Sequence, residues 1–238
     1  MNKLVKLGLG GGAAMLAAAA FWQAPAIGAE DVHVVPPPAL DMPGSDKHPG
    51  AATQTAVLAG GCFWGVQGVF EHVRGVTRVL AGYSGGKANT ANYETVSGGD
   101  TGHAESVQIS FDPKLISYGK ILQIFFSVAL DPTMNDAQGP DEGTQYRSDV
   151  FAVNADQEKV AKAYIAQLDQ AHAYHAPIAT RVDRLTGFYP AEAYHQDFLE
   201  THPNYPYIVV NDMPKVAALR SLFPGDYAGK ATMSGLKS

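Results

Sequence analysis

Strand-like and helix-like segments alternate from about residue 55 to residue 199, and this order constrains the fold more than any other feature of the chain. In residues 103–112 the apolar side chains of Val107, Ile109 and Phe111 occur at every second position, the period of a strand with one buried face. Residues 117–129 instead place apolar side chains at helical spacing. The alternation predicts an α+β fold: a two-layer sandwich with a mixed sheet and a split βαβ (ferredoxin-like) core.

We expect strands at residues 55–59, 76–83, 103–112, 149–153 and 177–184. Helices are expected from residue 62 to about 74 and at residues 117–129, 155–173 and 191–199. Between these elements lie two long polar segments, at residues 87–102 and 131–148. Loops of this length often carry functional residues.

The 238 residues divide into four parts by composition. Residues 1–29 resemble an export signal, because Lys3 and Lys6 precede an apolar run that ends at small residues. An uncleaved membrane anchor is the alternative; with cleavage, we expect the protein to be exported, to the periplasm. Residues 30–54 form a Pro/Gly-rich segment that predicts a mobile linker. We expect the catalytic domain at residues 55–223 and a flexible tail at residues 224–238.

The charge and cysteine content exclude several classes of function. A net charge of −6 and the absence of a basic cluster argue against a nucleic-acid partner. The eight histidines show no zinc-binding spacing, so we expect no metal. Exported proteins usually pair their cysteines, but the single Cys62 has no partner for an internal disulfide. It is therefore either an inert buried thiol or a reactive one.

Cys62 lies in the run Gly60-Gly61-Cys62-Phe63-Trp64-Gly65, between an expected strand and an expected helix. The N-terminus of a helix favours negative charge, so this position predicts a lowered pKa and a nucleophilic thiolate. The glycines leave space around the sulfur for a substrate. The alternative is a buried cysteine that acts as a small hydrophobe.

Glu105 shares the core-facing register of its strand with Val107 and Ile109. Burial would raise its pKa and keep it protonated, so that it could donate a proton to a reacting oxygen. The alternative is a glutamate at the strand edge that faces solvent.

Other polar residues in or beside the long loops are weaker candidates. The phenols of Tyr83, Tyr93 and Tyr146 could bind a substrate oxygen, although each alone could be an ordinary surface tyrosine. Asp141 lies in a segment with turn composition, and turn formation alone could explain it.

A thiol protease is a rival interpretation, because His195 and Asn211 follow Cys62 at roughly the spacing of papain-like enzymes. The local signature is absent, since Cys62 is followed by Phe63 rather than directly by Trp or Tyr. A secreted papain-like enzyme would also carry disulfides, which one cysteine cannot form.

Five segments in order resemble the peptide methionine sulfoxide reductases of the A type. They are GCFWG at residues 61–65, GYSGG at 82–86, NY at 92–93 leading to TGHAE at 101–105, GPDEGTQYRS at 139–148 and FYPAEAYHQ at 188–196. The resemblance covers about residues 55–210. It implies reduction of the S epimer of methionine sulfoxide, free or in peptides, without a cofactor.

The resemblance also implies roles for particular residues. By position, Cys62 is the nucleophile, Glu105 is the acid, and Tyr93 and Tyr146 hold the sulfoxide oxygen. Phe63 and Trp64 match the aromatic pocket for the sulfoxide methyl group, and Asp141 matches a polar residue that lines the site. Attack on the sulfoxide would leave methionine and a sulfenic acid on Cys62.

The chain departs from many members of this family because it has no second, resolving cysteine. Ser97 stands where many relatives have a cysteine, and Gln67 stands where an acidic residue is common. The sulfenic acid then requires an external reductant, such as a thioredoxin-like or glutaredoxin-like protein or a small thiol. We expect a monomer. The alternatives are a cysteine peroxidase and a redox-sensing or peptide-binding module without turnover.

Overall fold

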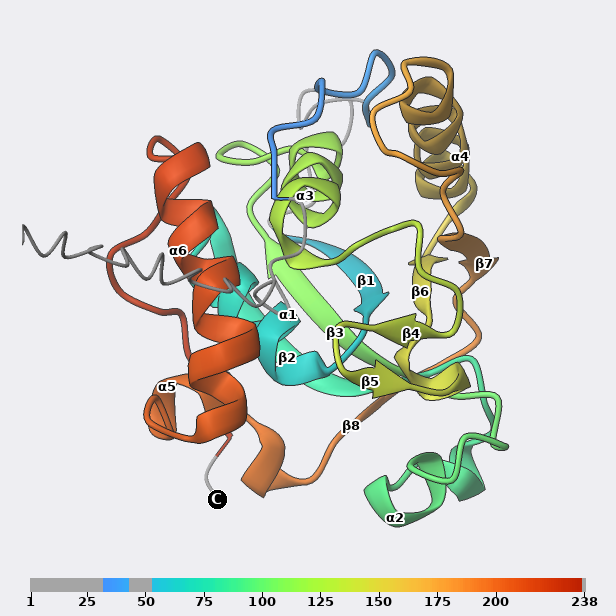
Figure 1. Cartoon of the computed structure of the whole chain (residues 1–238), viewed down its shortest axis with the longest axis vertical. Helices are drawn as coiled ribbons and strands as arrows, with labels where there is room; N and C mark the ends of the chain where they lie inside the picture. Colours follow the sequence, from blue (N-terminus) through green and yellow to red (C-terminus); the bar gives the residue numbers. More distant parts are fainter. Residues whose placement is uncertain (1–31, 43–52, 237–238) are drawn as a thin grey trace, which may run out of the picture.

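The computed structural model describes residues 32–42 and 53–236. The expected export signal at residues 1–29 lies outside these residues. A mixed sheet packs against helices (Figure 1), which confirms the α+β class and the mixed sheet. No helix within residues 32–42 and 53–236 has the length and apolar composition that crossing a membrane requires.

Within the described residues, the main sheet has six strands in the order β7-β6-β1-β3-β2-β8. β3 pairs antiparallel with both β1 and β2, β6 pairs antiparallel with β1, and β7 pairs parallel with β6. The strands are β1 (Gln54–Gly60), β2 (Val76–Ser84), β3 (Ala104–Phe111), β6 (Ser148–Ala152), β7 (Arg181–Arg184) and β8 (Phe188–Pro190). A separate short hairpin pairs β4 (Ala137–Gln138) with β5 (Asp141–Glu142).

Some of the helices begin after a residue whose side chain caps the first turn. Ser117 and Asn154 accept hydrogen bonds from Lys120 and Gln157 in the first turns of α3 and α4. The α-helices are α1 (Phe63–Glu71), α2 (Tyr93–Val96), α3 (Tyr118–Ile124), α4 (Ala155–Gln170), α5 (Phe198–Thr201) and α6 (Met213–Leu222). The 3₁₀ segments are η2 (Ala88–Thr90), η4 (Thr144–Tyr146) and η5 (Ala193–His195), and the π-helical segments are η3 (Phe125–Ala129) and η6 (Ile208–Asp212).

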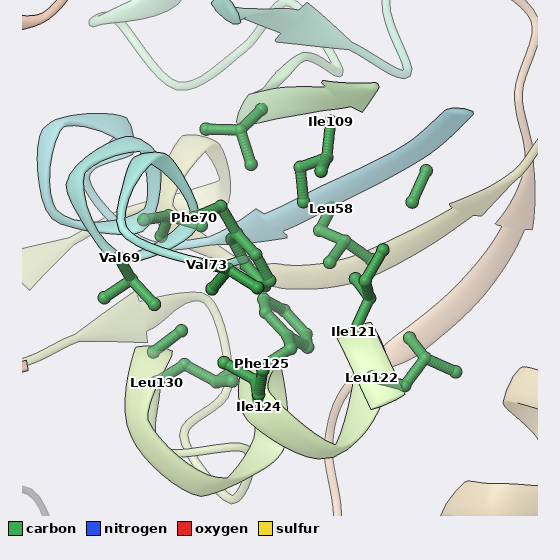
Figure 2. Packing of buried hydrophobic residues seen from close by; sticks show 14 of the residues in the cluster. Leu58, Val69, Phe70, Val73, Ile109, Ile121, Leu122, Ile124, Phe125 and Leu130 are labelled. Atoms are coloured by element: carbon green, nitrogen blue, oxygen red, sulfur yellow. The ribbon is translucent and has the colours of Figure 1, made fainter. Parts of the chain in front are cut away.

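The core lies between the sheet and the helices α1 and α3. Leu58 of β1 and Ile109 of β3 face Phe70 of α1 and Phe125 of η3, all fully buried (Figure 2). Burying each such side chain stabilises the fold by about 1.5–3 kcal/mol. This packing fixes the turn from β1 into α1, which is the turn that carries Cys62.

The helix expected at residues 191–199 is wrong. The segment follows the edge strand β8 and contains only the turn η5 and the start of the short helix α5, separated by Gln196 and Asp197. The amide of Gln196 bonds with both the N–H and the carbonyl of Ala81, so it acts as a further partner for strand β2. Asp197 has φ +55°, which breaks the helix.

The described part of the expected linker packs on the domain. Val35 is fully buried; its N–H donates to Ser127 Oγ at 3.2 Å and its carbonyl accepts from Gln123 Nε2 at 2.9 Å. Tyr164 of α4 donates to the carbonyl of Pro36 at 2.6 Å. Proline composition predicted mobility, but prolines also hold an extended backbone whose carbonyls are available to neighbours.

The segment expected as a flexible tail makes specific contacts up to Ser234. Thr232 N–H donates to the carbonyl of Glu71 at 2.8 Å, and Ala228 N–H donates to that of His72 at 2.7 Å. Ser234 is buried and donates twice to the carboxylate of Asp197, from N at 2.7 Å and from Oγ at 2.8 Å. The bonds from Thr232 and Ala228 satisfy carbonyls at the end of α1.

Candidate active site

Cys62 is half-buried and immediately precedes α1. β1 ends at Gly60, and Gly61 turns the chain with φ +85°, a conformation that favours glycine. The predicted strand-to-helix turn is therefore present, and it directs the free N–H groups of the first turn of α1 toward the region of the thiol.

The glycines around Cys62 make room for protein atoms rather than for a substrate. A Cβ on Gly60 would lie 2.9 Å from the ring of Phe125, and one on Gly61 would lie 2.5 Å from Cβ of Gln138. A Cβ on Gly65 would overlap Oδ1 of Asp212. The expectation that these glycines make room for a substrate is therefore corrected: they make room for side chains of η3, β4 and η6.

Glu105 lies on β3 with only 4% of its surface exposed, and its Oε2 accepts a hydrogen bond from Phe63 N–H at 3.0 Å. Burial raises the pKa of Glu105 to about 8, against the lowering effect of that N–H, and the charges of Asp141 and Asp212 raise it further. The carboxyl is therefore largely protonated at neutral pH and can donate a proton.

The pKa of Cys62 is raised well above its ordinary value, contrary to the sequence expectation. Burial is the largest cause, followed by the charges of Glu105 and Asp212; hydrogen bonding to Trp64 N–H lowers the pKa by less. The carboxyl of Glu105 already accepts a hydrogen bond from the first N–H of α1, that of Phe63. Carboxyl groups therefore lie at the N-terminus of α1 together with Cys62, and the sulfur of Cys62 is a protonated thiol at rest.

Tyr93 and Tyr146 come from different loops, at the start of α2 and at the end of η4. Burial raises the pKa of both phenols, and so does the charge of Glu105. Cys62 also contributes to both shifts, so the two phenols lie within electrostatic range of the thiol and the acid. Both hydroxyls are protonated donors at neutral pH.

Glu192 explains how Tyr93 is held in place. Its Oε1 accepts from Tyr93 N–H at 2.9 Å, and its Oε2 accepts from the hydroxyl of Tyr83 at 2.8 Å. Tyr83 is fully buried at the end of β2, so its hydroxyl anchors the carboxylate rather than facing a substrate. The motif at residues 188–196 contained Glu192, but no role was predicted for it.

A small pocket adjoins Cys62 between the β4–β5 hairpin and the chain that enters α6. Its lining includes Gln138, Pro140, Asp141, Tyr207, Asn211 and Lys215. Asp141 accepts a hydrogen bond from the hydroxyl of Tyr207. Burial raises the pKa of Asp141, while Tyr207 and Lys215 lower it. Sequence patterns missed Tyr207, Asp212 and Lys215, because residues 205–215 carry no catalytic signature.

Trp64 and Phe63 have different surroundings. Trp64 is partly exposed and stacks on Phe198 with ring centroids 3.9 Å apart, and its Nε1 donates to His195 Nδ1 at 3.2 Å. The ring of Phe63 is only 1% exposed and packs between Tyr83 and His195. Trp64 therefore presents apolar surface, whereas Phe63 contributes its backbone N–H to Glu105.

His195 and Asn211 do not form a protease triad with Cys62. Burial lowers the pKa of His195, and its Nδ1 accepts the indole N–H, which leaves the neutral imidazole in one tautomer. Asn211 bonds the carbonyl of Tyr207 at 3.1 Å. In the described part of the chain, no hydrogen bond joins the thiol to His195. In the same residues, no group of three or more His, Cys, Asp or Glu could hold a metal ion.

The site thus combines a thiol, a protonated carboxylic acid and two phenolic donors beside an apolar ring. A sulfoxide sulfur becomes electrophilic when its oxygen is protonated or strongly hydrogen-bonded. These groups are suited to react with a sulfoxide. The acid and the phenols can donate hydrogen bonds or a proton to its oxygen, and the thiol can attack its sulfur.

Comparisons with known proteins lead to the same chemistry. Residues 54–225 match the sequence model of the family described as "Peptide methionine sulfoxide reductase". The chain is 55% identical over 188 residues to "Peptide methionine sulfoxide reductase MsrA 2" of Mesorhizobium japonicum, covering 79% of this chain and 96% of that protein. A protein of the same name from Synechocystis sp. is 51% identical over 191 residues, covering 80% of this chain and 88% of that protein.

A solved structure also resembles this fold. Reduced Mxr1 from Saccharomyces cerevisiae superimposes with a TM-score of 0.60 at 32% identity, covering 68% of this chain and 92% of that chain. The match to the family model, over residues 54–225, extends over the residues that build the site, from β1 to α6. The chain belongs to the peptide methionine sulfoxide reductase family.

Proposed function

We infer that this chain reduces methionine-S-sulfoxide, free or in proteins, to methionine, and so repairs oxidised proteins. One observation carries the inference: the fold holds the carboxyl of Glu105 on the first N–H of α1, directly after Cys62. The first turn of α1 therefore fixes the position of the nucleophile and of the proton donor relative to each other. Membership of the family agrees with this assignment.

The reaction follows from the groups at the site. The hydroxyls of Tyr93 and Tyr146 orient the sulfoxide oxygen, and Glu105 donates its proton to that oxygen. The sulfur of Cys62 attacks the sulfoxide sulfur, and the oxygen passes to Cys62. Glu105 recovers a proton from the thiol. One thiol and one sulfoxide become one sulfenic acid and one thioether.

Trp64 provides the apolar wall for the sulfoxide methyl group, since its ring is partly exposed and rigidly held by Phe198 and His195. The contribution of the Phe63 ring would be indirect, because the ring lies buried behind the site. We propose that Asp141, fixed by Tyr207, lines the polar side of the substrate pocket.

We propose that an external thiol restores the enzyme, because Cys62 is the single cysteine of these 238 residues. Two thiol groups are oxidised to a disulfide, while the sulfenic acid is reduced to the thiol and its oxygen leaves as water. A thioredoxin-like or glutaredoxin-like protein fits this requirement. Ser97, which takes the place of a cysteine in many relatives, bonds the carbonyl of Tyr93 and cannot serve as a resolving thiol.

We further propose that the protein is exported to the periplasm after cleavage near residue 29, and that it acts as a monomer. The support for export is the composition of residues 1–29. We also propose a split βαβ (ferredoxin-like) core. Its support is that β3 lies between β1 and β2, which α1 connects, while β6 flanks β1.

The direct test is mass spectrometry of the protein mixed with methionine-S-sulfoxide and no reductant. We expect one oxygen added at Cys62 and one equivalent of methionine released, with multiple turnovers only after dithiothreitol is added. Cys62→Ser should release no methionine. An unmodified Cys62 in the unsubstituted protein, with no methionine formed, would exclude the proposed reaction.

A further inference from the structure

The last helix of the domain brings charged residues to the active site. η6 and α6 lie against α1 (Figure 1). Tyr207, Asn211 and Lys215, which surround Asp212 in the sequence, all line the pocket beside Cys62. The C-terminal part of the domain is therefore a wall of the site and not only a support for α1.

Asp212 itself lies against the first turn of α1. Its side chain fills the space where Gly65 lacks a Cβ, three residues after Cys62. The residue has no exposed surface. A buried carboxylate at this place acts on the N-terminus of α1, which would otherwise favour an anionic sulfur. Gly65 in the GCFWG segment is thus explained by Asp212, which no sequence pattern connected with Cys62.

The charges that face this carboxylate come from several elements. Cys62 precedes α1, Glu105 is on β3, Asp141 is on β5, Tyr207 precedes η6, and Lys215 is on α6. The charge of Asp212 raises the pKa of Cys62, of Glu105 and of Tyr207. Lys215 acts in the opposite sense on Asp141, whose pKa it lowers.

We propose that Asp212 is a positioning residue of the active site, which keeps Cys62 a thiol and Glu105 a protonated acid through its charge beside the first turn of α1. The catalytic meaning of this role rests on the proposed function. The role itself does not, because the ionisation of Cys62 can be measured without any sulfoxide.

The test compares Asp212→Asn, which keeps the shape and removes the charge, with the unsubstituted protein and with Asp156→Asn. Asp156 is exposed on the first turn of α4 and controls for net charge. The rate of alkylation of Cys62 by iodoacetamide is followed from pH 6 to 11. We expect the midpoint to move to lower pH in Asp212→Asn and to stay in Asp156→Asn. An unchanged or higher midpoint in a folded Asp212→Asn overturns the proposal.

A second readout separates this role from a merely structural one. In single turnovers with methionine-S-sulfoxide, the alkaline fall of the rate should move to lower pH in Asp212→Asn, because Glu105 loses its proton earlier. A lower rate at every pH without movement of the profile overturns the proposal. If alkylation shifts but no sulfoxide is reduced even by the unsubstituted protein, the proposed function fails and the electrostatic role stands.

Asp212→Ser is a second uncharged variant, in case the asparagine variant does not fold. In the unsubstituted protein, carboxyl 13C resonances can be followed against pH. The proposal expects an Asp212 resonance, assigned separately from that of Asp141, that moves with the ionisation of Cys62 and loses this movement in Cys62→Ser. Absence of such a resonance would contradict it without any change at position 212.

Discussion

The backbone N–H of Phe63 donates to Oε2 of Glu105 at 3.0 Å, and this bond joins the acid of the site to the residue that follows its nucleophile. The bond fixes the carboxyl on the first turn of α1. The other oxygen of the carboxyl is thereby left to carry a proton toward the substrate.

Glu105→Gln should slow the formation of sulfenic acid by about 10²- to 10⁴-fold, the usual contribution of a general acid, while the fold is retained. The amide keeps the shape and the acceptor for Phe63 N–H but has no acidic proton to give. Rapid-quench measurement of methionine release in single turnovers checks this. Glu158→Gln on α4 is the matched control and should react at the normal rate. A normal rate for Glu105→Gln would assign the proton to another donor.

The first chemical step should lose rate as pH rises through about 8, where Glu105 gives up its proton. The pKa of Cys62 is raised well above its ordinary value, so Glu105 loses its proton before Cys62 does as the pH rises. Single-turnover rates between pH 6 and 10 test this, and the fall should be absent in Glu105→Gln. A rate that climbs steadily through this range would show that ionisation of the thiol, and not proton donation, limits the step.

Trp64→Ala should raise KM for methionine-S-sulfoxide roughly 2- to 12-fold, since an aromatic contact contributes about 0.5–1.5 kcal/mol beyond its buried area. Trp64→Phe keeps an aromatic face, although it loses the bond to His195. Steady-state kinetics with saturating dithiothreitol separate KM from kcat. Equal KM values for the alanine variant and the unsubstituted protein would place the methyl pocket elsewhere.

Glu71 lies at the end of α1, and its buried carboxyl has a pKa of about 10, raised first by burial and then by Asp197. In the unfolded chain the pKa is near 4.5, so the unfolded state gains by ionisation as pH rises from 4.5 to 10. The contribution of Glu71 to the free energy of unfolding is therefore fully present below pH 4.5 and is lost progressively as the pH rises to 10.

Glu71→Gln should therefore flatten the decline of stability with pH, by at most about 1.4 kcal/mol per pH unit. Urea unfolding at pH 5, 7 and 9 measures this difference. The exposed Glu94→Gln serves as the control and should leave the slope unchanged. Parallel stability profiles for Glu71→Gln and the unsubstituted protein would mean that Glu71 is ionised in the folded state.

Ser234→Ala should destabilise the domain by about 1–3 kcal/mol, because it leaves a buried carboxylate oxygen of Asp197 without its donor. Thermal unfolding compares it with Ser221→Ala on the exposed face of α6, which should behave like the unsubstituted protein. If both substitutions have equally small effects, the contact of Ser234 with Asp197 does not stabilise the C-terminal segment.

Local patterns in the sequence predicted the parts of the site that depend on one element. The alternation of residues 103–112 placed Glu105 on a buried face, and the glycine turn placed Cys62 before a helix. They did not predict the protonation of Cys62, because the raised pKa depends first on burial of the thiol and then on the charges of Glu105 and Asp212, which meet it only in the fold. The helix expected at residues 191–199 failed for a similar reason: the side chain of Gln196 pairs with β2, far away in the sequence.

The fit of Asp212 against Gly65 couples two positions that are distant in the chain. Any side chain at position 65 would have to displace the carboxylate, so the residue at one position limits what the other can become. An engineer who grafts the GCFWG turn onto another scaffold must therefore transfer the η6–α6 segment with it. Otherwise the transplanted cysteine would have a different electrostatic environment and a different pKa.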